Sequence, residues 1–133
     1  MTEQNSQPDL DVHEFILQNF DSVPHLEAVV LLWNSRPAGW TCEDLAARLY
    51  ISADKVKALL RDLVRLQLVA ESPTAPSQYS YFPQSSRQDE MMLRVDAAYR
   101  HELVRISTMI HAKASPAVLE FARAFRLKKE RDR

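Results

Sequence analysis

Four histidines are the first side chains in this sequence that could bind a metal ion. Two of them, His13 and His101, precede a glutamate, which is how the zinc-binding motif His-Glu-x-x-His begins. The second histidine of that motif is missing, because Leu17 and Arg105 stand four residues further on. We therefore interpret the histidines as structural or surface residues, and we expect no metal and no other cofactor.

The single cysteine, Cys42, directly follows Thr41, which opens a predicted helix. A helix N-terminus lowers the pKa of a thiol, so one interpretation is a redox sensor. No basic neighbour or second cysteine supports that role, and we favour a small packed side chain. The sequence also offers no nucleophile–base pair, no glycine-rich phosphate loop and no paired-carboxylate cleft. We therefore expect a protein that is not an enzyme.

The composition is that of an ordinary globular domain. The chain has 133 residues, of which 46% are apolar and 26% are charged, and its net charge is −1. No apolar run approaches the roughly 18 residues that cross a bilayer, and the acidic N-terminus lacks the apolar core of a secretory signal. These features predict a cytoplasmic protein that makes no membrane contact.

Apolar periodicity and capping residues predict a mostly α-helical chain with a small β-hairpin. Ser22 and Pro24 open a helix that Pro37 ends, and two prolines between the short strands favour a hairpin-like loop. Helices are expected at 11–20, 25–35, 41–50, 53–67, 87–114 and from Ser115 onward, and strands at 68–71 and 79–82.

The third and fourth predicted helices are the most informative pair. Each begins with a capping residue, Thr41 and Ser52, whose hydroxyl can accept a backbone N–H of the first turn. Only Tyr50 and Ile51 join the two helices. A turn that short forces the helices to cross steeply and exposes the outer face of the second one.

The segment WTCEDLAARLYISADKVKALLRDLVRLQLV resembles the winged helix-turn-helix of bacterial regulators. The residues that carry the resemblance are the two caps, a Leu-Ala pair, the apolar positions of both helices and the Leu-Val that enters the wing. They are Thr41, Leu45, Ala46, Leu49, Ile51, Ser52, Val56, Leu60, Leu63, Leu68 and Val69. Gln67 stands where glycine is usual before the wing, and the wing itself, ESPTAPSQYSYFP, contains no Lys or Arg.

The whole chain is similar to the MarR architecture, in which terminal helices form a dimer. The resemblance implies a winged helix-turn-helix core with long C-terminal helices. We divide the chain into a disordered acidic N-terminus (1–10), the winged helix-turn-helix domain with its preceding short helix (11–86), a helical dimerisation segment (87–127) and a charged tail (128–133).

The resemblance implies a transcriptional regulator that reads double-stranded DNA with helix 52–67 in the major groove. The DNA-contacting residues would be Ser52, Lys55, Lys57, Arg61 and Arg65, with Arg48 on the preceding helix. The alternative is a winged-helix protein–protein interaction module without DNA binding. It is favoured by a wing without Lys or Arg and by residues 21–70, which carry six basic and six acidic groups. Exposed aromatic residues of the second strand would then join this helix in contacting a protein partner.

An apolar stripe along the long helix predicts a homodimer interface. Its residues step by 3, 4, 4, 3 and 4 positions, close to an 11-residue repeat that keeps a stripe nearly straight. They are Met92, Val95, Tyr99, Leu103, Ile106 and Ile110. The stripe either packs inside the chain against the first helix or forms a dimer seam. We favour the seam, because long terminal helices are poorly covered by so small a domain.

Overall fold

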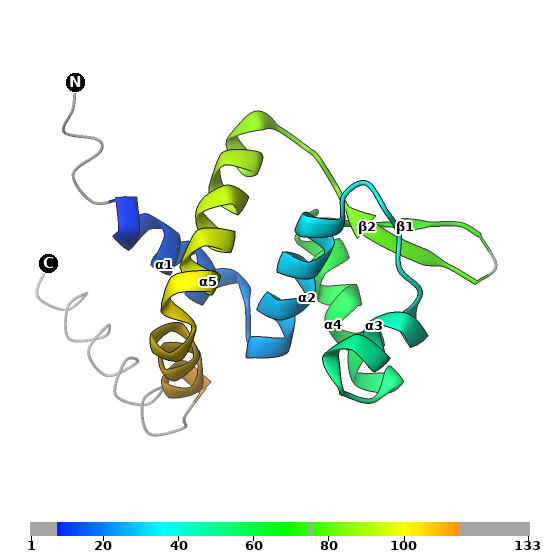
Figure 1. The fold of residues 1–133 in the computed structure, drawn as a ribbon, viewed down its shortest axis with the longest axis horizontal. Helices are drawn as coiled ribbons and strands as arrows, with labels where there is room; N and C mark the ends of the chain where they lie inside the picture. Colours follow the sequence, from blue (N-terminus) through cyan, green and yellow to red (C-terminus); the bar gives the residue numbers. More distant parts are fainter. Residues whose placement is uncertain (1–7, 75, 115–133) are drawn as a thin grey trace, which may run out of the picture.

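The computed structural model describes residues 8–74 and 76–114 and confirms the mostly helical architecture with a small hairpin. Helices α1 and α5 lie at one end, α3, α4 and the hairpin lie at the other, and α2 lies between them (Figure 1). The predicted last helix and the charged tail lie outside the described residues. The elements are α1 (Pro8–Asn19), α2 (Val23–Ser35), α3 (Cys42–Leu49), α4 (Ala53–Arg65), β1 (Val69–Ser72), β2 (Gln78–Tyr81) and α5 (Ser86–Ala114).

The two predicted caps are confirmed. The hydroxyl of Thr41 accepts the Asp44 N–H at 3.1 Å, and the hydroxyl of Ser52 accepts the Lys55 N–H at 3.2 Å. Tyr50 ends α3 in the left-handed conformation (φ 60°, ψ 41°) and its N–H bonds back to the Ala46 carbonyl. The left-handed backbone of Tyr50 lets the chain reverse between α3 and α4. This conformation costs a non-glycine residue about 1 kcal/mol or more.

The apolar sectors of α2 and α4 face each other and form the centre of the core. In α4 the side chains of Val56, Leu59, Leu60 and Leu63 are all buried, as their helical spacing predicts. The predicted face of α2 is buried as well, and Leu45 of α3 closes the cluster. The opposite sector of α4 is thereby left in solvent.

The wing is an antiparallel pair in which Val69 stands opposite Tyr81. Each strand differs by one residue from its predicted bounds. Trp40, in the link before α3, adds to this sheet by exchanging two backbone hydrogen bonds of 2.8 Å with Tyr79. Gln67 adopts φ 63°, so the position where glycine is usual is left-handed here too.

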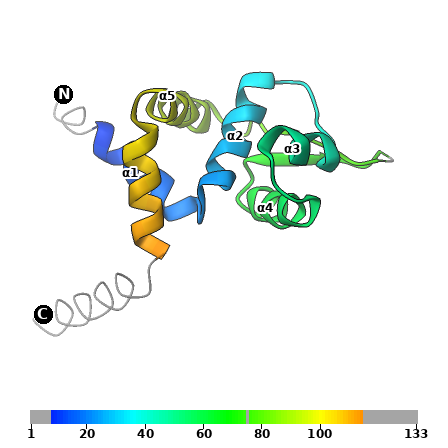
Figure 2. The same ribbon diagram turned by 60° about the horizontal axis from the view of Figure 1, so that its bottom comes forward.

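Helix α5 is not the single straight helix that the sequence predicts. Its backbone leaves the helical region at Glu102 (φ −134°, ψ 32°), and its two arms run in different directions, with the second alongside α1 (Figure 2). The Glu102 carboxylate is bonded at 3.0 Å to Nε2 of His13, a buried residue of α1. The Lys113 ammonium, near the end of the second arm, donates to the carbonyls of Leu17 and Phe20. The bend therefore lets the second arm cap and cover α1.

The apolar stripe of α5 divides between core and surface. Met92, Val95, Ile106 and Ile110 are fully buried within the single chain, and Tyr99 is half-buried. These four residues fill the space between α5 and the other helices, so they are not free to meet a second chain directly. Leu103 remains 37% exposed, and Val104 beside it, which the stripe did not include, is 80% exposed. Most of the stripe therefore packs within the chain, the alternative to a dimer seam that the sequence left open, and the homodimer itself stays a prediction.

Within residues 8–74 and 76–114, no helix is both long and apolar enough to span a membrane.

Candidate nucleic-acid interface

The outer face of α4 carries the cations that the sequence singled out. Lys55, Lys57, Arg61 and Arg65 are all exposed. At 100° per residue, Arg61 and Arg65 lie opposite the buried apolar sector of α4, and Lys55 and Lys57 lie on its two flanks. Ser52, the N-cap, is exposed at the beginning of the same helix. Four cations within eleven residues give this face the charge that phosphate groups or guanine edges need.

Lys57 and Arg61 lie in a groove between α4 and the wing. The groove encloses about 450 Å³. Its lining comes from the start of α3, from α4 and from the wing: Cys42, Glu43, Lys57, Arg61, Val64, Glu71, Pro76, Ser77 and Tyr79. Two carboxylates therefore share this space with the two cations, and the groove has no excess of positive charge. Sequence reasoning missed this balance, because Glu43 and Glu71 lie in other elements.

Cys42 lines the groove and is buried at 8% exposure. Burial, and then the charge of Glu43, raise the pKa of the thiol, while Lys57 acts in the opposite direction. The shift is opposite to the one that a reactive cysteine needs. This supports the interpretation of Cys42 as a packed side chain.

Arg65 belongs to a chain of hydrogen bonds that leads into the core. Its guanidinium donates to Oδ1 of Asp62 at 2.7 Å, and the other oxygen, Oδ2, is bonded at 2.9 Å to Nε2 of His25 on α2. Nδ1 of His25 lies 2.7 Å from the hydroxyl of Ser22. The bond from His25, more than the pair with Arg65, lowers the pKa of the Asp62 carboxyl. These hydrogen bonds could not be predicted from the sequence, because His25 and Asp62 are 37 residues apart.

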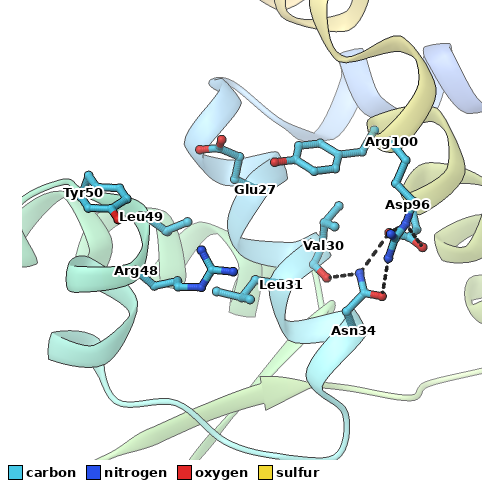
Figure 3. Close-up of a pocket in the computed structure, with 10 residues that line it drawn as sticks. Glu27, Val30, Leu31, Asn34, Arg48, Leu49, Tyr50, Asp96 and Arg100 are labelled. Atoms are coloured by element: carbon cyan, nitrogen blue, oxygen red, sulfur yellow. Dashed lines mark hydrogen bonds and ion pairs between the residues drawn. The ribbon is translucent and has the colours of Figure 1, made fainter.

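Arg48 does not join the cations of α4. It lines a second cavity of about 420 Å³ between α2, the α3–α4 turn and α5, and its side chain reaches toward Leu31 of α2 (Figure 3). On the α5 side, Asn34, Asp96 and Arg100 are joined by hydrogen bonds. The structure therefore separates Arg48 from the five other residues proposed to contact DNA.

The aromatic residues of the second strand and of the α3–α4 turn differ in exposure and do not lie together. Tyr81 is buried, Tyr79 is half-buried in the groove, and Phe82 is 38% exposed beside the wing. Tyr50, at the rim of the second cavity, is 90% exposed. They therefore do not form the single aromatic edge that the sequence suggested.

Comparison with solved structures identifies the fold. The transcriptional regulator Tm0710 from Thermotoga maritima aligns over 94% of this chain and 88% of its own, with 10% identity and a TM-score of 0.52. RV1404 from Mycobacterium tuberculosis aligns over 97% and 89%, with 17% identity and a TM-score of 0.51. The chain has a MarR-like winged-helix fold. The fold predicted from the sequence is thereby confirmed.

A structure of MepR, described as a transcription regulator of the Staphylococcus aureus multidrug efflux pump MepA, shows a weaker likeness. It covers 93% of this chain and 91% of its own, at 18% identity and a TM-score of 0.47, and adds nothing to the assignment. The sequence matches no protein-family model and no curated protein. The likeness is therefore one of fold.

Proposed function

We propose that this chain is a winged-helix transcription regulator that binds duplex DNA with the outer face of α4. The observation that carries the proposal is a set of four exposed cations on α4, a helix that only residues 50–52 separate from α3. A helix of this geometry enters the major groove with its N-terminal residues toward the bases. Lys55 and Lys57 would then lie nearest the base edges, and Arg61 and Arg65 nearest the phosphates.

The side chains of the wing contribute no positive charge to this interface. Residues 69–82 contain one carboxylate, Glu71, and no Lys or Arg. Between α4 and the wing, the cations available for phosphate contact therefore come from α4. If Arg61 and Arg65 each neutralise one phosphate, the logarithm of the binding constant falls with the logarithm of salt concentration at a slope of about −1.8 for each protomer.

We further propose that the protein is a homodimer whose contact includes Leu103 and Val104. These side chains are exposed next to each other on the second arm of α5, the arm that packs on α1. A two-fold dimer would place two copies of α4 on one DNA duplex, which is the arrangement that reads paired half-sites.

The alternative is a protein-interaction module that does not bind DNA. The specific observation in its favour is the groove between α4 and the wing, where Glu43 and Glu71 offset the charges of Lys57 and Arg61. Phe82, exposed on the wing side, adds an apolar contact of the kind that protein partners bury.

The deciding experiment is a salt titration of binding to genomic DNA fragments. We expect the wild type to bind at low salt, and Lys57→Ala and Arg61→Ala each to weaken binding. Where the contact is to a base edge, the variant loses about 1–3 kcal/mol of binding free energy. Where the contact is to a phosphate, the slope of the salt dependence changes by about one. If the wild type is not retained on DNA even at low salt, the DNA-binding proposal fails and the interaction module takes its place.

A further inference from the structure

Asp62 occupies an unusual place on the proposed DNA-binding face. A carboxylate beside phosphate groups repels them, so the simplest expectation is that Asp62 weakens DNA binding. Yet its two oxygens are both engaged, one by the guanidinium of Arg65 at 2.7 Å and the other by Nε2 of His25 at 2.9 Å. The side chain thus links a residue of the core to a cation of the surface.

Exposure to solvent increases along the series of side chains from the core to the surface. The side chain of His25 is 12% exposed, that of Asp62 is 33% exposed and that of Arg65 is 70% exposed. An ionised carboxylate can only accept hydrogen bonds, so Nε2 of His25 carries the proton of the 2.9 Å bond. In neutral His25, Nδ1 then accepts from the hydroxyl of Ser22, at the start of α2. Both ring nitrogens are therefore engaged and hold the imidazole in one orientation.

We propose that Asp62 is a positioning residue for DNA binding, held from behind by His25, and that it fixes the guanidinium of Arg65 on the outer face of α4. The inference rests on the proposed function and explains how the Arg65 guanidinium is oriented for its contact with DNA. A free arginine loses much rotamer freedom when it binds a phosphate, and an arginine already held in place loses less. Asp62 engages only part of the fork of five N–H donors, so other donors remain for DNA.

This role and simple charge repulsion predict opposite signs for one substitution. Asp62→Asn removes a negative charge from the DNA face, so repulsion alone predicts tighter binding. Positioning predicts weaker binding, because an uncharged amide holds the guanidinium less well. Asp54 is the matched control: it is exposed in the first turn of the same helix, and the described residues give it no ion pair.

The experiment measures binding of one DNA fragment, across a salt series, by the wild type, Asp54→Asn, Asp62→Asn, Arg65→Ala and the double variant Asp62→Asn/Arg65→Ala. We expect Asp54→Asn to bind more tightly and Asp62→Asn to bind about two- to fivefold more weakly, the range that orienting one exposed ion pair can supply. The salt slope of Asp62→Asn should move toward that of Arg65→Ala. In the absence of Arg65, Asp62→Asn should no longer weaken binding. Thermal unfolding of each variant confirms that it is folded.

The outcomes separate this inference from the function on which it rests. Wild-type binding together with a tighter Asp62→Asn overturns the positioning role and leaves the DNA-binding proposal standing. An equal loss for Asp62→Asn with and without Arg65 also overturns it, since the carboxylate would then act on the fold alone. A wild type that binds no DNA refutes the proposed function itself. His25→Phe, which removes the N–H behind Asp62, should weaken binding only while Arg65 is present; an unchanged affinity would exclude His25 from the role.

Discussion

The hydroxyl of Tyr81 donates a 2.6 Å hydrogen bond to the carboxylate of Asp89, and this bond ties the wing to the first arm of α5. Tyr81 ends β2, and its ring meets Trp33 of α2 edge to face at 4.9 Å between centroids. Only 3% of Tyr81 is exposed. Burial first, and the bond to Asp89 second, raise the pKa of Tyr81 to about 12. The neutral phenol is therefore part of the folded core.

The raised pKa predicts that stability falls as pH rises from about 10 to 12. In this window the unfolded chain releases the Tyr81 proton and the folded chain keeps it, so the free energy of unfolding decreases with pH. A shift of two pKa units corresponds to roughly 2–3 kcal/mol. Because other groups titrate there too, the measurement is the difference in urea-unfolding free energy between the wild type and Tyr81→Phe. A difference that stays constant with pH would contradict the prediction.

Much of the fold could be predicted from the sequence because its signals are local. Thr41 and Ser52 lie directly before the turns that they cap, and the buried sector of α4 follows from residue spacing alone. The bend of α5 is different, because no proline or glycine marks Glu102. Its partner His13 is 89 residues away, and only packing of α1 on α5 brings them together.

The sequence predicted which charged residues of the candidate site are exposed. It did not predict which residues of other elements lie beside them. Helical spacing placed Lys57, Arg61 and Arg65 in solvent, as observed. It did not reveal that Glu71 of the wing shares the groove of Lys57 and Arg61, because the approach of wing and helix is a tertiary contact. The orientation of Arg48 toward α2 likewise depends on how α3 packs, which the periodicity of one helix does not contain.

The proposed dimer contact predicts that Val104→Glu and Leu103→Glu yield monomers. Both positions have solvent access in the single chain, so the charge costs the folded monomer little. In a dimer the introduced carboxylate would be buried without a partner, which would destabilise the dimer by on the order of 3 kcal/mol or more. Sedimentation velocity at micromolar concentration gives the measurement, with Leu93→Glu, on the exposed side of the first arm, as the matched control. A monomeric wild type, or a Val104→Glu protein that remains dimeric, would refute this contact.

The burial of Cys42 predicts a thiol of low reactivity. Its raised pKa leaves little thiolate at neutral pH, so a disulfide reagent should label the folded protein more slowly than the same protein in urea. Cys42→Ser should fold, lose about 1 kcal/mol or slightly more because a hydroxyl replaces a buried thiol, and bind DNA as the wild type does. If the folded protein is labelled faster than the protein in urea, Cys42 is a reactive cysteine and not an inert packed side chain.

The last prediction concerns Glu71, the one carboxylate of the wing that lines the groove with Lys57 and Arg61. If those cations bind DNA, Glu71 competes with phosphate for them, and Glu71→Gln should tighten binding by roughly 0.5–1 kcal/mol at low salt. The gain should shrink as salt screens the groove. Asp44→Asn, which removes an exposed carboxylate from α3 at a position that does not line the groove, is the control and should change affinity less. Equal gains for both variants would mean that the overall charge of the domain matters and the pairing in the groove does not. Weaker binding by Glu71→Gln would mean that Glu71 holds Lys57 and Arg61 in place for DNA, as Asp62 is proposed to hold Arg65.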